Sequence, residues 1–127
     1  MQLALKNDLP FATVMVNHQG ETVTISNVLV DTGSATTIFS ADMMALVHIV
    51  PSPEDILFTI RGVGGTEVVF TRTIERIQIA ELSLSQFDVE IGGMDYGFDI
   101  NGILGMDFLR QSGAIINLRN LTIDFAE

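Results

Sequence analysis

The sequence predicts an all-β domain spanning residues 1–127, most simply a closed or partly closed barrel with one or two short helices. Short apolar runs rich in β-branched residues recur along the chain and are separated by turn residues. The three prolines lie at Pro10, Pro51 and Pro53, and no low-complexity stretch separates the apolar runs. These observations favour one continuous domain.

The first elements predicted are a hairpin and a short helix. Phe11 to Asn17 and Glu21 to Val30 are β-rich, and the polar turn that joins them ends in Gly20, where a positive φ is favourable. Ser40 is suited to cap a helix over Ala41 to Val47, which must end before Pro51.

A glycine-rich hairpin follows. Leu57 to Ile60 and Val68 to Thr71 flank a tip that holds three glycines, so the tip is predicted to form a mobile flap. Thr73 to Ile91 alternates over two further strands, with a turn near Glu81 to Ser83.

The C-terminal third completes the predicted barrel. An apolar run resumes over Ile100 to Leu104, and Asp107 to Gln111 forms at most a short helix that stops at Gly113. Ala114 to Leu118 and Leu121 to Phe125 form a last hairpin.

Composition narrows the range of functions. The net charge of −10 and the lack of a basic stripe exclude nucleic acid as a partner. No apolar run reaches the ~18 residues of a membrane span, and the start of the chain does not resemble a signal peptide, so a cytoplasmic location is expected. A hydrophobic fraction of 47% suggests apolar surface buried against another chain, hence an oligomer.

Acidic residues are concentrated from Glu81 to Leu109, where six acids occur without a Lys or Arg. They are not grouped at metal-ligand spacing, so they are predicted to form a solvated face. Asp107 is interpreted as an acid placed at a helix N-terminus rather than as a cleft residue.

The stretch Val28-Leu29-Val30-Asp31-Thr32-Gly33-Ser34 carries the functional signal. A lone carboxylate at the end of a buried strand costs several kcal/mol unless it is paired or protonated. The tetrapeptide Asp-Thr-Gly-Ser also occurs in ordinary loops, where Asp caps a turn. The residues around Asp31 by themselves therefore leave two interpretations open, a functional carboxylate and an ordinary turn-capping residue.

Two more motifs follow in a distinctive order: Ile60-Arg61-Gly62-Val63-Gly64-Gly65, and Ile103-Leu104-Gly105-Met106-Asp107-Phe108-Leu109. Together with the Asp31 stretch, this order resembles the retropepsin-like aspartic proteases of the bacterial and retroviral single-domain type, from about Phe11 to Phe125. The resemblance implies an acid-protease-like barrel.

The resemblance also implies a site. Asp31 would be catalytic, and because the chain has one Asp-Thr-Gly, a homodimer would pair two Asp31 residues around a shared proton. Thr32 would bond across this dyad, Gly33 would let backbone amides approach it, and Ser34 could bond the outer oxygen of Asp31.

The other two motifs have implied roles as well. Gly62, Val63, Gly64 and Gly65 would form the substrate-binding flap, whereas Ile103, Leu104 and Gly105 would pack under the active loop. The terminal segments Leu3 to Leu5 and Leu121 to Phe125 are expected interface strands.

The implied function is an aspartic endopeptidase that acts on a peptide or protein substrate without a metal or another cofactor. The alternative is a non-catalytic peptide-binding or assembly module on the same fold, since a monomer would hold half a site.

Overall fold

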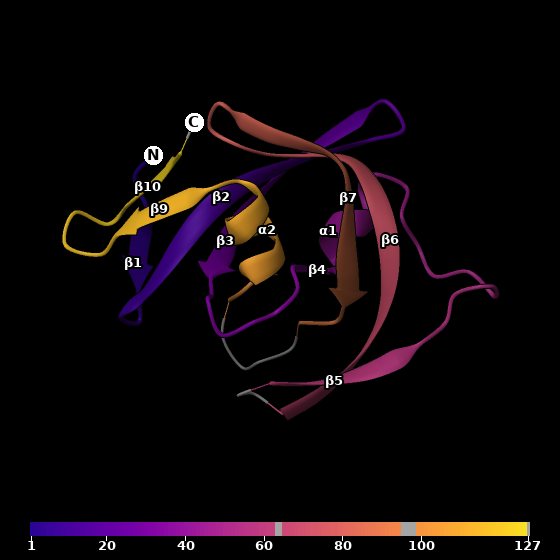
Figure 1. Ribbon diagram of the computed structural model, residues 1–127. Coiled ribbons are helices and arrows are strands. Elements are labelled where there is room, and N and C mark those ends of the chain that lie inside the picture. Colours follow the sequence, from indigo (N-terminus) through magenta and orange to yellow (C-terminus); the bar gives the residue numbers. More distant parts are fainter. Residues whose placement is uncertain (63–64, 95–98, 127) are drawn as a thin grey trace.

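The computed structural model describes residues 1–62, 65–94 and 99–126, which contain ten strands and two helices (Figure 1). The elements are β1 (Ala4–Lys6), β2 (Leu9–His18), β3 (Glu21–Val30), β4 (Ile38–Ser40), α1 (Ala41–Ala45), β5 (Phe58–Gly62), β6 (Gly65–Ile79), β7 (Leu82–Gly92), β8 (Gly102–Leu104), α2 (Met106–Gln111), β9 (Ala114–Asn117) and β10 (Thr122–Phe125).

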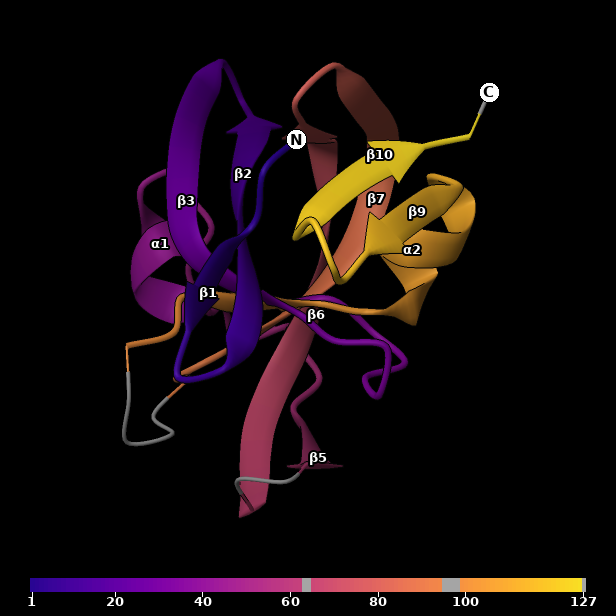
Figure 2. The same ribbon diagram turned by 90° about the vertical axis from the view of Figure 1, so that its left-hand side faces the viewer.

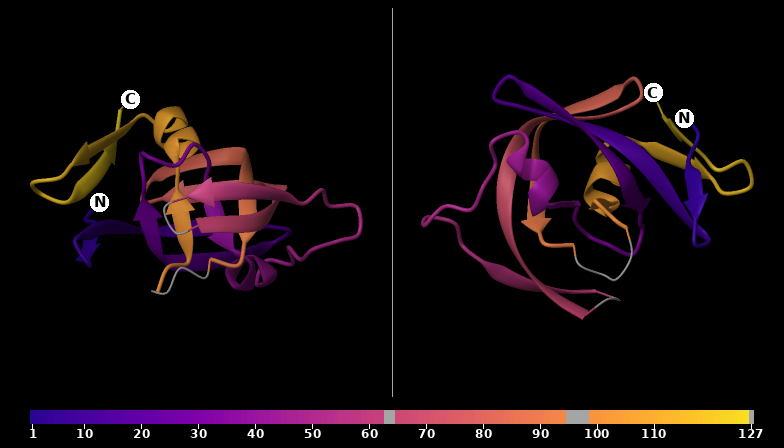
Figure 3. Two further views of the ribbon diagram at one scale, coloured as in Figure 1. Left: turned by 90° about the horizontal axis from the view of Figure 1, so that it is seen from below. Right: turned by 180° about the vertical axis from the view of Figure 1, so that it is seen from behind.

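Most strands belong to one curled sheet. Its order is β1-β2-β3-β8-β4-β7-β6-β5, and β2 pairs in addition with β6. This extra pairing brings distant strands of the order together, so the sheet forms a partly closed barrel (Figure 3). The all-β prediction is confirmed.

The main core lies inside this barrel. Val28 and Val30 of β3 point into it, as do Val89 and Ile91 of β7. Helix α2 adds Phe108, which is fully buried and meets Phe87 edge-to-face at a centroid distance of 6.0 Å.

A second apolar cluster lies apart from this core. Its buried members are Phe11, Ile38, Met94 and Ile100, and Leu29, Ile60 and Ile103 pack against them partly exposed. Register explains the grouping, because Leu29 is paired with both Phe11 and Ile103, and Ile103 is paired with Ile38. Side chains of paired residues share one face of a sheet.

Local predictions hold with two corrections. The hairpin of β2 and β3 is confirmed, and the hydroxyl of Ser40 caps α1 by accepting from the Met43 N–H at 3.2 Å. However, α1 ends at Ala45 rather than Val47, and His48 soon adopts a φ of 66°, which no helix continues. The two strands predicted on either side of Arg72 are one strand, β6.

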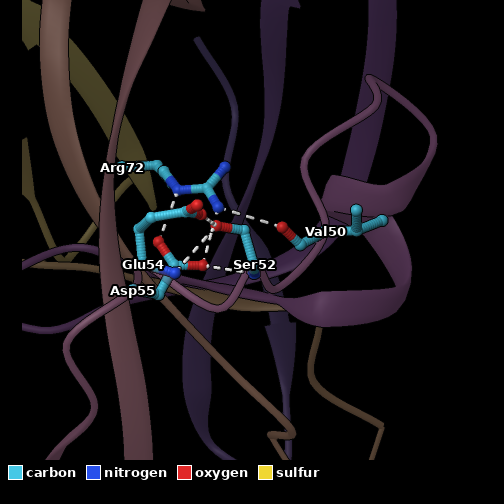
Figure 4. Close-up of polar contacts among 5 residues, drawn as sticks. All are labelled: Val50, Ser52, Glu54, Asp55 and Arg72. Atoms are coloured by element: carbon cyan, nitrogen blue, oxygen red, sulfur yellow. Dashed lines mark hydrogen bonds and ion pairs between the residues drawn. The ribbon is translucent and has the colours of Figure 1, made fainter.

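The connector between α1 and β5 is fixed to β6 by polar contacts (Figure 4). Arg72 donates to both carboxylate oxygens of Asp55, at 3.0 and 2.7 Å, and to the Val50 carbonyl at 3.0 Å. Asp55 also accepts from the Ser52 N–H at 2.7 Å. These bonds hold the pKa of Asp55 below its usual range, the Arg72 guanidinium being the largest cause.

The two termini lie on the same side of the barrel, beside the β9–β10 hairpin (Figure 3). The Leu3 N–H donates to Leu121 O at 2.7 Å, and the Ile123 N–H donates to Met1 O at 2.9 Å. Strand β10 therefore has backbone partners along both edges, β9 on one and the N-terminal residues on the other.

Neither helix in the described part of the chain has the length and apolar character needed to traverse a bilayer.

Candidate active site

Asp31 directly follows β3, and its N–H donates to Leu104 O of β8 at 3.0 Å. Residues alternate between the faces of a strand, so Val28 and Val30 enter the main core while Leu29 and Asp31 are directed to the opposite face. Asp31 is only partly buried. The apolar run thus delivers the carboxylate to an accessible edge, and the expected burial cost is largely avoided.

The loop after Asp31 orients its carboxylate. The Gly33 N–H donates to Oδ1 at 2.8 Å, and a Cβ added at residue 33 would lie 3.1 Å from that oxygen. Within the described residues, Oδ2 accepts no hydrogen bond. One oxygen is therefore fixed, and the other is left for a water or a second carboxyl group.

Thr32 and Ser34 differ in their surroundings. Thr32 is exposed, and its hydroxyl makes no hydrogen bond to the described residues of its own chain. The Ser34 hydroxyl donates to Thr36 O at 2.7 Å, so the expected bond from Ser34 to Asp31 is wrong. The reason is local: the turn brings the carbonyl two residues ahead within reach of a serine side chain.

The Ile103-Leu104-Gly105 motif lies directly behind this loop. Ile103 pairs with Leu29, and Leu104 pairs with Val30. A Cβ at Gly105 would lie 2.2 Å from Thr36 O, so only glycine allows the loop and the start of α2 to approach this closely. The Met106 N–H then donates to Ser34 O at 2.8 Å.

A second link between the loop and α2 was not predicted from the sequence. Thr37 is fully buried, and its hydroxyl donates to Asp107 Oδ1 at 2.7 Å and accepts from the Gly105 N–H at 3.1 Å. Asp107 also accepts from the Thr37 N–H at 3.1 Å. Asp107 therefore holds the loop to α2, in agreement with its interpretation as a structural acid at a helix start.

Within the described part of the chain, Thr32 borders two open hollows. One of about 700 Å³ is lined by Thr32, Gly33, Ala35 and the α2 residues Met106, Asp107, Arg110 and Gln111. The other, of about 320 Å³, extends from Thr32 past α2 to Ala114 and Ile116 of β9. The loop after Asp31 and β9 thus lie on the same side of the molecule.

The glycine-rich hairpin forms from β5 and the start of β6, with Gly62 paired to Gly65. The predicted flap residues Val63 and Gly64 lie outside the described residues. The loop that follows β3 lies between α2 and this hairpin (Figures 1 and 2). Ile60 of β5 packs on the second apolar cluster.

The acidic segment is not uniformly solvated as predicted. Glu90 is 7% exposed and Asp107 is partly buried. The prediction treated these acids as one group, and it did not reveal that Glu90 is paired with Ile38, a buried member of the second apolar cluster.

Comparison with known proteins identifies the family. A model of the gag-polyprotein putative aspartyl protease family matches residues 12–111, a stretch that includes Asp31 and both other motifs. The fold and this match define the class as retropepsin-like aspartic proteases. The chain belongs to the gag-polyprotein putative aspartyl protease family. None of the curated proteins with which the chain was compared matches it.

Proposed function

We propose that the chain is an aspartic endopeptidase that works as a homodimer and hydrolyses peptide bonds with water held between two Asp31 side chains. The observation that carries this proposal is the Asp31 loop. Its carboxylate is partly exposed, one oxygen is held by the Gly33 N–H, and the other is open.

The chemistry follows from the behaviour of two close carboxyl groups. They cannot both ionise, so they share one proton. The ionised Asp31 accepts a proton from the water as it attacks the peptide carbonyl, and the protonated Asp31 of the second copy donates to the developing oxyanion. The β5–β6 hairpin is suited to act as the flap, because its backbone can hold an extended peptide as an added strand.

The dimer is proposed to form through β9 and α2. Of the terminal segments first expected at the interface, Leu3 bonds to Leu121 within one chain, and the edge of β10 that faces away from β9 is occupied over residues 121–123 by the N-terminal residues. Strand β9 has a free edge among the described residues, and Ile115 and Leu118 beside it are 56% and 70% exposed. Since Thr32 and β9 border one hollow, a twofold contact here brings two Asp31 loops together.

Cleavage of a denatured protein mixture, followed by mass spectrometry, tests the proposal. Wild type and Asp31→Asn are compared between mildly acidic and neutral pH, with Asp8→Asn as control, because Asp8 is an exposed acid in a turn. We expect cuts by wild type and the control and none by Asp31→Asn. Equal cutting by Asp31→Asn, or no cutting by a proven wild-type dimer, would overturn the proposal.

The same samples separate the enzyme from a binding module. A module that only holds peptides would retain them in both wild type and Asp31→Asn and cut none. An enzyme would cut with wild type, and Asp31→Asn would still bind.

A further inference from the structure

Glu90 is a buried acid that the proposed chemistry does not use. The residue is 7% exposed, and Oε2 is buried without a hydrogen-bond partner among the described residues. The backbone N–H of Glu90, in contrast, is satisfied: it donates to Thr37 O at 2.9 Å. An unsatisfied buried carboxyl oxygen opposes folding, so its presence calls for a function.

Register places the Glu90 side chain on the face of the second apolar cluster. Glu90 is paired with Ile38 of β4 on one side and with Thr71 of β6 on the other. Its neighbours Val89 and Ile91 enter the main core, so Glu90 points to the opposite face. Ile38 is a buried member of the cluster on that face.

Asp31 is directed to this same face. Leu29, two residues before Asp31, is paired with Ile103, and Ile103 is paired with Ile38 beside Glu90. In the sheet, β7 is the third strand along from β3, and at the usual spacing between strands this corresponds to a distance of about 14 Å. An extended peptide that crosses these strands covers that distance in about four residues.

No cation of the described chain satisfies Glu90. Arg72, on the adjacent strand β6, is held by Asp55 in a two-pronged contact. Glu67, an acid on the cluster face of β6, accepts from the Met94 N–H at 2.6 Å and so fastens the segment after β7. Glu90 is different, because its buried Oε2 has no hydrogen-bond partner among the described residues.

We propose that Glu90 binds a Lys or Arg side chain of the substrate, within about four residues of the cleaved bond; this rests on the proposed peptidase function. A cationic donor satisfies the open oxygen, and their attraction is strong because the apolar cluster excludes water. Ile60 covers the cluster, and β5 is paired only with β6 among the described strands. Under this proposal, the peptide reaches Glu90 when β5 moves away from the second apolar cluster.

The test is the cleavage profile of a peptide library, with wild type, Glu90→Gln, Glu90→Leu and the control Asp88→Asn. Asp88 is an exposed acid two residues before Glu90 on the same strand. We expect Lys and Arg to be enriched at one position near the cut for wild type and the control. For matched peptides with lysine or norleucine there, the kcat/KM ratio should fall at least tenfold in both Glu90 variants. No enrichment in wild type, or its persistence in Glu90→Leu, overturns the proposal.

Two further measurements keep the two proposals separable. If wild type cuts nothing, the peptidase proposal fails, and binding of lysine-scanned peptides to wild type and Glu90→Gln then tests Glu90. A preference for lysine-containing peptides that wild type shows and Glu90→Gln lacks supports the role of Glu90. Equal binding of these peptides by the two proteins overturns it. Urea unfolding should show Glu90→Leu at least as stable as wild type, and a large loss of stability would mean that Glu90 is a structural residue.

Discussion

The hydroxyl of Thr37 donates to Asp107 Oδ1 at 2.7 Å, which ties the loop carrying Asp31 to helix α2. The two residues are 70 positions apart in sequence. The same hydroxyl accepts from the Gly105 N–H, so a single buried side chain joins the loop to two residues at the start of α2.

Thr37→Val should destabilise the protein by about 1 to 3 kcal/mol, because it removes the hydroxyl while leaving the partners of that hydroxyl unsatisfied. Thr37→Ser keeps the hydroxyl and should lose less. Urea denaturation of both variants measures the difference. Equal loss in the two variants would show that the methyl group of Thr37, rather than its hydroxyl, stabilises the loop.

Gly105→Ala should cost about 3 kcal/mol or more, since the added Cβ would lie 2.2 Å from Thr36 O, where backbone must move. Gly93→Ala is the matched control, because a Cβ there meets only Glu67 Oε1 at 3.8 Å. Thermal and urea unfolding compare the two. A stable Gly105→Ala protein would contradict the close approach of α2 to the loop.

Stability should fall in acid partly through Asp55. The pKa of Asp55 is lowered in the folded state by Arg72, so its contribution is present above the unfolded pKa of about 3.9 and is lost as the pH falls through the folded value. Asp55→Asn should flatten the stability curve below about pH 4, with Asp8→Asn as the control. The Asp55–Arg72 ion pair is partly exposed, with side-chain exposures of 11% and 29%, so added salt should reduce the effect. If the stability of Asp55→Asn fell in acid as steeply as that of wild type, the attribution of this loss to Asp55 would be wrong.

The dimer should tighten in mild acid or with added salt, because each chain carries a net charge of −10 and the two repel at neutral pH. Sedimentation across pH and ionic strength measures this. A dissociation constant that does not respond to either condition would rule out charge repulsion as a determinant.

Ile115→Glu should weaken the dimer at least tenfold, because it places a charge beside the free edge of β9 in both copies. Leu46→Glu is a matched control, since Leu46 is 59% exposed against 56% for Ile115 and lies next to α1. Sedimentation of the two variants at one pH locates the interface. Equal weakening by both would place the contact elsewhere.

Local sequence patterns were sufficient to predict the fold class and to single out Asp31. Alternating apolar runs and turn residues act over a few neighbouring positions, so the first hairpin and the Ser40 cap were predicted correctly. The order of the three motifs was enough to indicate the family, which the match over residues 12–111 then showed.

The contacts between residues far apart in the chain could not be predicted from these local patterns. The burial of Glu90, the bond between Thr37 and Asp107, and the pairing of Leu3 with Leu121 all join segments far apart in the chain. Strand periodicity reports which face a side chain takes. What covers that face depends on strand order and closure, and these are fixed when the sheet curls into a barrel.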